Sequence, residues 1–181
     1  GIQNNIGSNG GVYLSAGRKI KVNDGLITSR NDLAISSTNQ LDLKDSNLYS
    51  RDTGIYINSV GTDIANAAIN VTNAVLDAKT KLAIQSSGLL NLTDLSLPIA
   101  SGQSSTRVQD VLFTAQQNLN LTQTKQMLQP IKGKLGIAAG GDISLATGLT
   151  GANVEVKGLR GIDIEGTNIK TKNIKLSTAG N

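Results

Sequence analysis

The stretches VYLSAGRKIKV, at residues 12–22, and LAISSTNQLDL, at residues 33–43, follow one rule. Two apolar residues two positions apart are followed, eight positions later, by a second such pair. The chain repeats the rule at Val12/Leu14 with Ile20/Val22, Leu33/Ile35 with Leu41/Leu43, Leu82/Ile84 with Leu90/Leu92, Val111/Phe113 with Leu119/Leu121, Leu135/Ile137 with Ile143/Leu145, and Val154/Val156 with Ile162/Ile164. A spacing of two is the period of a strand with one buried face, and its return at a fixed offset indicates a solenoid.

A third strand follows at another constant offset. Ile27, Leu48 and Ile169 each lie 15 residues after the first apolar residue of their repeat. Val12 and Leu33 are 21 residues apart, and Leu135 and Val154 are 19 residues apart. We therefore predict that residues 1–181 form one all-β domain, a right-handed parallel β-helix with three short strands per coil of about 19–22 residues and roughly seven coils stacked about 4.8 Å apart.

Composition agrees with a narrow core. Aromatic residues make up 2% of the chain and hydrophobic residues 38%, which suits a thin axial stack of Leu, Ile and Val. Gly, Asn, Asp and Ser separate the paired strands, where tight corners are needed.

Neither cysteine nor histidine occurs in the chain. This excludes disulfides, thiolate nucleophiles, zinc sites of the Cys/His kind and imidazole catalysis. The net charge is +4, and basic residues are slightly concentrated near the end of the chain, at Lys157, Arg160, Lys170, Lys172 and Lys175. We interpret them as solvated side chains that keep the stacked strands soluble. With few aromatic residues to stack bases, we expect no nucleic-acid binding.

Two stretches break the rule, near residues 63–78 and 98–110. In the first, the apolar spacing fits either a helical face or two strands around Thr72-Asn73, and we favour strands because neighbouring coils need an unbroken ladder. The spacing at residues 108–119 likewise leaves strand and helix open. The polar string after Pro98 predicts an extruded loop, and we expect a contact surface there, at Ser101, Gln103, Ser104, Ser105 and Arg107.

The acidic residues do not predict a catalytic centre. Asp42/Asp45 and Asp163/Glu165 are the only close groupings, and we interpret both as solvated faces or turn residues. Tyr49 and Tyr56 are expected to be neighbours on adjoining coils, forming one small aromatic patch. We therefore expect no catalytic residues, no cofactor and no metal site.

The strings at residues 31–37 (NDLAISS), 40–48 (QLDLKDSNL) and 140–146 (GGDISLA) resemble the haemagglutinin repeats of large two-partner-secretion exoproteins. That family includes filamentous haemagglutinin and the contact-dependent growth-inhibition exoproteins of Gram-negative bacteria. The resemblance covers nearly the whole chain, is strongest at residues 12–57 and 135–176, and is one of pattern. The Asn-Pro-Asn motifs of the family's amino-terminal secretion domain are absent, so the chain resembles an internal shaft segment.

The resemblance implies a structural or binding shaft segment of a secreted or surface-displayed exoprotein acting in adhesion or contact-dependent inhibition, without catalysis. Its implied partners are the parent's outer-membrane transporter and a protein or glycan on a host or target cell, with end-to-end or side-by-side self-association as a further option. Two alternatives remain: a carbohydrate-active β-helix, such as a polysaccharide lyase or tailspike, and an autotransporter passenger segment.

Overall fold

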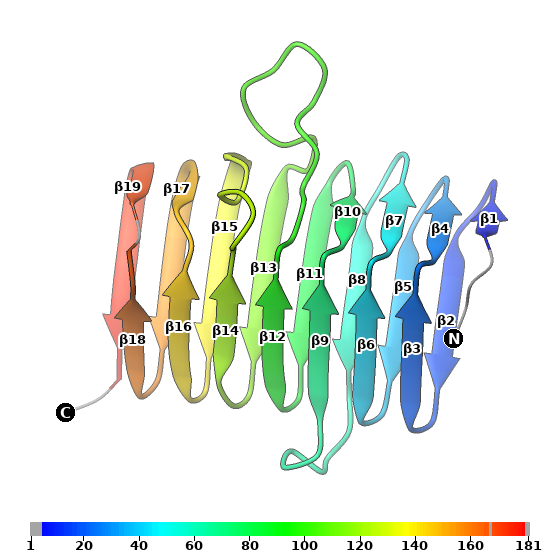
Figure 1. The fold of residues 1–181 in the computed structure, drawn as a ribbon, viewed down its shortest axis with the longest axis horizontal. Helices are drawn as coiled ribbons and strands as arrows, with labels where there is room; N and C mark the ends of the chain where they lie inside the picture. The colour runs from blue at the N-terminus through cyan, green and yellow to red at the C-terminus, as the bar shows by residue number, and fades with distance from the viewer. Residues whose placement is uncertain (1–4, 167, 180–181) are drawn as a thin grey trace.

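A computed structural model describes residues 5–166 and 168–179. These residues contain strands, turns and irregular segments but no helix, and they wind into a parallel β-solenoid of about eight turns with roughly 21 residues per turn (Figure 1). The predicted fold is confirmed, with one coil more than the approximate count of seven.

Three parallel sheets run along the solenoid, each taking one strand from successive coils. The first sheet contains β2 (Val12–Ala16), β5 (Leu33–Ser37), β8 (Ile55–Ser59), β11 (Lys81–Ser86), β13 (Asp110–Ala115), β15 (Ile131–Ala139), β17 (Leu149–Gly158) and β19 (Ile169–Thr178). The second contains β3 (Lys19–Asn23), β6 (Gln40–Lys44), β9 (Ala68–Thr72), β12 (Leu89–Thr93), β14 (Leu119–Thr122), β16 (Asp142–Ala146) and β18 (Gly161–Ile164). The third contains β1 (Ile6–Ser8), β4 (Leu26–Ser29), β7 (Asn47–Ser50) and β10 (Val75–Asp77).

The core is an axial stack of aliphatic side chains. In the first sheet Leu33, Ile55 and Leu82 are paired in register and have no exposed surface. Leu41 and Ile69 are likewise paired in register and fully buried in the second sheet. Each inward side chain therefore packs on its counterpart one coil away, and removal of these aliphatic surfaces from water drives the coils to stack.

The third sheet changes along the chain. It ends as a sheet at β10, beyond which Val75 forms an isolated parallel bridge with Ser96. In the last coils the third strand joins the following first-sheet strand, so β17 contains both Leu149, paired with Ile169, and Val154, paired with Leu135. A register shift between Ile131 and Lys134 marks the join in β15.

Aspartate and asparagine occupy the corner that leads out of the second sheet. Asp24, Asp45, Asn73 and Asp94 have φ of 50 to 51° on four successive coils. Asp and Asn tolerate this left-handed conformation better than other residues with a Cβ. Asp94 also accepts hydrogen bonds from the Thr124 amide (2.6 Å) and hydroxyl (2.8 Å), and these bonds lower the pKa of its carboxyl.

Both predicted interruptions contain an insertion, the first between β8 and β9 within one coil and the second between β12 and β13. After β8 the chain turns at residues 63–66, where the Ala67 amide donates to the Asp63 carbonyl at 3.0 Å, and it re-enters the second sheet at β9. The preference for strands in this region is confirmed by β9 and β10, and the open choice at residues 108–119 is resolved by β13 and β14. The second insertion projects as a long hairpin between β12 and β13 (Figure 1).

Candidate functional site

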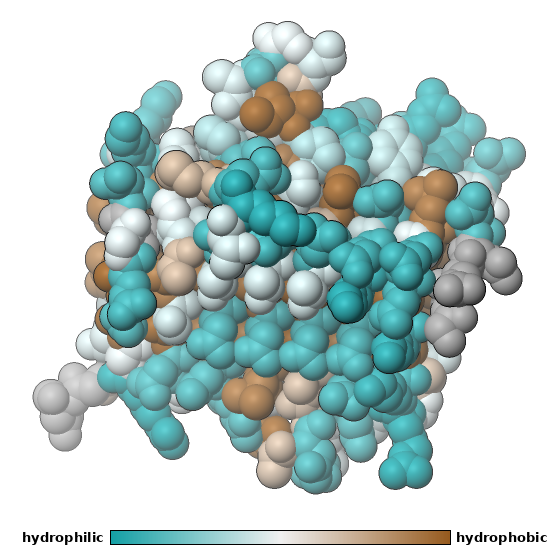
Figure 2. Space-filling view, viewed as in Figure 1, coloured by the Kyte–Doolittle hydropathy of each residue, from teal (hydrophilic) through white to brown (hydrophobic). Residues whose placement is uncertain are grey.

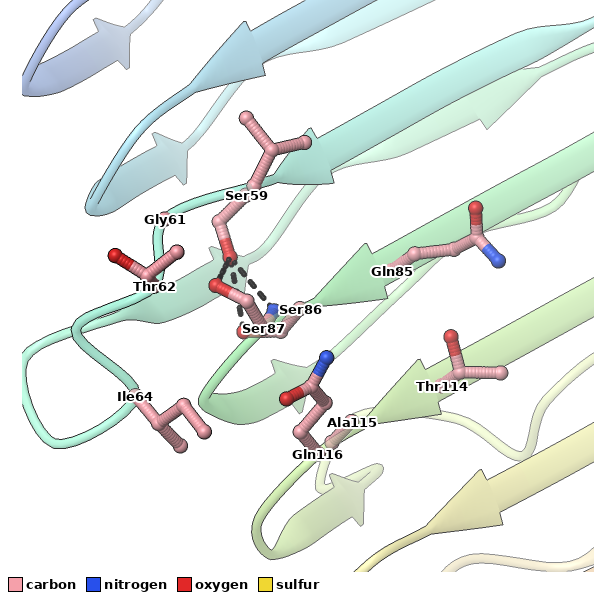
Figure 3. Close-up of a pocket in the computed structure, with 11 residues that line it drawn as sticks. Ser59, Gly61, Thr62, Ile64, Gln85, Ser86, Ser87, Thr114, Ala115 and Gln116 are labelled. Atoms are coloured by element: carbon pink, nitrogen blue, oxygen red, sulfur yellow. Dashed lines mark hydrogen bonds between the residues drawn. The ribbon is translucent and has the colours of Figure 1, made fainter.

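A groove opens beside the first insertion, at the C-terminal ends of β8, β11 and β13 (Figure 3). Its volume is about 590 Å³. Three consecutive coils line it, with Ser59, Val60, Gly61, Thr62, Ile64, Gln85, Ser86, Ser87, Thr114, Ala115 and Gln116. The first insertion supplies one wall, and the next two coils supply the floor.

Two glycines let the insertion fold closely against the solenoid. A Cβ on Gly61 would collide with the Thr38 carbonyl oxygen, and a Cβ on Gly88 would collide with the Ala67 carbonyl oxygen. Because both obstacles are backbone atoms, a side chain at either position would displace the wall of the groove.

Serine hydroxyls fix the inner end of the groove. The Ser59 and Ser86 hydroxyl oxygens are 3.2 Å apart, and Ser59 Oγ accepts a hydrogen bond from the Ser87 amide at 3.0 Å. Ser86 Oγ accepts one from the Gly88 amide at 3.1 Å. These buried serines stabilise the corner at the ends of the strands through hydrogen bonds. Gln85 and Thr114 instead extend from the outward face of their strands (Figure 3).

The lining of the groove is electrically neutral, with hydroxyl, amide and aliphatic side chains. Such groups bind a ligand through hydrogen bonds and apolar contact, and they do not themselves transfer protons at neutral pH. The arrangement is therefore suited to holding a neutral polar ligand.

The hairpin of the second insertion brings together four of the five predicted contact residues. An antiparallel bridge joins Ile99 to Thr106, and the Ala100 amide donates to the Ser105 carbonyl at 3.2 Å. Beyond this bridge Ser101, Gln103 and Ser104 are exposed, with Ser105 half-buried. Whether this tip makes contact with a partner stays a prediction.

Arg107, the fifth of these residues, faces the body of the solenoid. Its Nε lies 2.5 Å from the Asp77 carboxylate, and its terminal nitrogens donate to the Ser50 carbonyl (2.6 Å) and the Arg51 carbonyl (2.9 Å). The guanidinium also lies 5.0 Å from the centre of the Tyr49 ring. Arg107 thus fastens the base of the hairpin to the third sheet.

The expected pairing of Tyr49 with Tyr56 is wrong. Tyr49 lies in β7 of the third sheet, whereas Tyr56 lies in β8 of the first sheet, beyond the intervening corner. In the first sheet the outward column that contains Tyr56 also contains Tyr13, with Ala34 between them. Sequence reasoning missed this pair, although equal offsets from Val12 and Ile55 place both residues at one outward position.

Asp42 and Asp45 have separate structural roles. Asp42 lies on the outward face of β6, where its carboxylate is 2.9 Å from Lys19 Nζ and accepts a hydrogen bond from the Asn70 amide at 2.8 Å. Asp45 occupies a left-handed corner. The interpretation of this grouping as face and turn residues is confirmed, and Asp163 likewise lies in β18, beside Ser144.

An asparagine ladder continues from Asp42 across the second sheet. Asn91 donates to Asn70 Oδ1 at 2.9 Å, and Asn120 donates to Asn91 Oδ1 at 2.8 Å. A row of hydrophilic side chains crosses this face along the long axis of the molecule (Figure 2). Because each amide is bonded to its neighbour, the ladder strengthens the stack.

Part of the basic concentration is neutralised. Lys134 and Lys175 lie 2.8 and 3.6 Å from the Glu155 carboxylate, and the hydrogen bond from Lys134 lowers the pKa of Glu155. Lys170 is paired in the ladder with Thr150. These contacts on the outward face of β17 and β19 agree with the interpretation of solvated side chains.

Within residues 5–166 and 168–179, no cluster of three or more acidic side chains is placed to hold a metal ion. The same residues include no helix with the length and apolar character needed to cross a membrane. Comparison of the chain with protein-family models, curated proteins and solved structures found no match.

Proposed function

We propose that this chain is a structural and binding segment of a large secreted or surface-displayed bacterial exoprotein, acting in adhesion or contact-dependent inhibition and not in catalysis. The observation that carries the proposal is the unbroken register of the first sheet. Leu82 pairs with Ile55 across the first insertion and with Val111 across the second. A shaft that keeps its ladder while presenting inserted segments can display binding surfaces without losing stability.

The haemagglutinin-like strings support the same proposal. Residues 31–48 form β5, β6 and the start of β7, and residues 140–146 include β16, all within regular coils. The absence of cysteine is also compatible with export of an unfolded chain, since no disulfide has to form.

Surface display can be tested on the bacterium that produces the protein. Antibodies raised against the folded chain should label intact cells, and external protease should remove the labelling. Labelling that appears only after lysis would contradict the proposal. Antibodies against a cytoplasmic protein of the same cells provide the control for leakage.

The second candidate function is a carbohydrate-active β-helix. Asp163 lies in β18 and Glu165 follows the end of this strand, and both side chains are exposed. Incubation with acidic and neutral polysaccharides in the presence of calcium distinguishes the two functions. We expect no new reducing or unsaturated ends. Turnover that is lost in Asp163→Asn or Glu165→Gln would establish the enzyme instead.

A further inference from the structure

Two tyrosines form a regular pair on the outward face of the first sheet. Tyr13, Ala34, Tyr56 and Ala83 follow one another in register on β2, β5, β8 and β11. Tyr13 is 71% exposed and Tyr56 is partly exposed. Two ladder spacings separate the tyrosines, so their Cα atoms are about 9.6 Å apart along the solenoid axis.

The two rings share one local feature. Each ring reaches back over a glycine two residues earlier, and a Cβ on Gly11 or Gly54 would come within 2.6 or 2.9 Å of ring atoms. The alanine between the tyrosines leaves the space between the rings free of a large side chain. The two tyrosines therefore form two aromatic platforms, of which Tyr13 is the more exposed.

A column of polar side chains accompanies the platforms. Two residues after the tyrosine column, the outward positions of successive strands are Ser15, Ser36, Asn58, Gln85 and Thr114. This column leads directly into the groove, which Gln85 and Thr114 line. Hydroxyl and amide groups thus run beside the aromatic platforms in the direction of the solenoid axis.

Pyranose rings have the chemistry that this surface fits. Their C–H faces stack on aromatic rings, while their hydroxyl groups exchange hydrogen bonds with amides and hydroxyls. In an extended β-1,4-linked chain every second ring presents the same face, and the repeat is close to the separation of the two tyrosines. Burial and the nearby negative charge of Asp32 both raise the pKa of Tyr56. The same charge disfavours binding of an anionic polysaccharide on this side.

We propose that the outward face of the first sheet binds a neutral, extended β-1,4-linked polysaccharide along the solenoid axis, with alternate sugar rings stacked on Tyr13 and Tyr56. The neighbouring hydroxyl and amide column, from Ser36 to Gln85, receives the sugar hydroxyls, and the groove accommodates the continuing chain. This inference names a ligand class for the binding role under "Proposed function" and rests on that role.

Titration calorimetry of the full 181-residue chain with soluble oligosaccharides tests the proposal. We expect binding of cellohexaose or chitohexaose, and these two arms identify which sugar substituents the surface accepts. Affinity should rise steeply from the disaccharide to the tetrasaccharide, because only the longer chain reaches both rings. Maltohexaose, whose α-linkages curve the chain, should bind more weakly. Absence of binding to both β-linked hexasaccharides, or preference for maltohexaose or a sulfated glycan, would overturn the proposal.

Single substitutions assign the binding to the two platforms. Tyr13→Ala and Tyr56→Ala should each weaken binding by about tenfold or more, as truncation of an aromatic anchor does. Tyr13→Phe and Tyr56→Phe should retain binding, because the stacking surface remains. The matched control is Tyr49→Ala on the third sheet, with folding verified by circular dichroism. An equal loss in this control, or no loss in either platform variant, contradicts the assignment.

The two proposals fail separately. Oligosaccharide binding without antibody labelling of intact cells would refute surface display and leave the ligand class standing. Labelling of intact cells by a chain that binds no β-1,4-linked oligosaccharide would refute the ligand class alone.

Discussion

Arg107 shows how much one side chain contributes to the attachment of an insertion. It is 24% exposed and its partner Asp77 is 19% exposed, so the ion pair is shielded from much of the solvent. Three backbone carbonyls of the two preceding coils, those of Ser50, Arg51 and Asp77, also accept hydrogen bonds from it. The hairpin base is therefore held to β7, with the turn that follows it, and to β10 through one guanidinium group.

Replacement of this residue tests the attachment. Arg107→Ala should lower the free energy of unfolding by about 1–3 kcal/mol, because the Asp77 carboxylate and three backbone carbonyls lose a charged donor. Urea denaturation followed by circular dichroism measures the change. The matched control is Arg30→Ala, which breaks a more exposed pair with Asp52 and should cost less than about 1 kcal/mol. Equal losses in the two variants would show that Arg107 does not fasten the hairpin.

At the scale of the element, the second sheet is held by its outward face as well as by its core. The asparagine ladder ends at Asp42, which accepts bonds and donates none when ionised. Burial raises the pKa of Asp42, but hydrogen bonds from Asn70 and Lys19 outweigh it, and the net pKa lies below the ordinary value of 3.8. Ionised Asp42 thus stabilises the folded ladder.

The ladder predicts a specific dependence on pH. Because the folded pKa of Asp42 is depressed, its contribution is present above the unfolded pKa and is lost as pH falls through the folded value. Asp42→Asn should lower the free energy of unfolding by about 1 kcal/mol at neutral pH. At acid pH the difference between the variant and the parent chain should be smaller, because Asp42 is then protonated. Urea denaturation at neutral and acid pH measures both effects. Asp24→Asn, outside the ladder, is the control, and an identical pH response in the two variants would contradict the role of Asp42.

At the scale of the whole molecule, stability passes from coil to coil. Each interior strand of the first and second sheets bonds to the strands immediately before and after it in the stack, and the inward side chains form one continuous cluster. Leu90 is fully buried in the middle of this stack, between Ile69 and Leu119. A cavity at this position should therefore weaken the stabilising contacts between this coil and its two neighbours.

Leu90→Ala should lower the free energy of unfolding by about 2–5 kcal/mol, through lost apolar burial and the cavity left behind. Hydrogen exchange should show the greatest loss of amide protection in β9, β12 and β14 and a smaller loss in β3 and β18. Leu159→Ala is the control, because Leu159 is 44% exposed. Uniform loss of protection along the chain would argue against transmission through nearest neighbours.

The local sequence pattern alone was sufficient to predict the repeating unit of three strands. Alternation at Val12 and Leu14 commits these residues to one face of a strand, and the same alternation eight and fifteen positions later defines the other two sheets. The strands at β9 and β10 were also predictable, because the ladder had to continue through them. The repeating unit depends on residue spacing within one coil, which can be read directly from the sequence.

The candidate site was predicted only in part, because it depends on insertions of unequal length. The hairpin tip could be placed from its polar string, but the role of Arg107 could not, since its partners Asp77 and Ser50 lie 30 and 57 residues away. The Tyr13–Tyr56 pair was missed for a related reason: the two are 43 residues apart, and only coil-to-coil register aligns them.

The sequence by itself determined the all-β solenoid, its three sheets and the identity of its axial core, because backbone alternation and hydrophobic burial act within each coil. Only the tertiary structure decided which outward side chains share a column, where the groove opens, and how the third sheet merges into the first. Those outcomes depend on the residue at which the ladder resumes after each insertion. Hydrogen bonding between successive coils selects that residue.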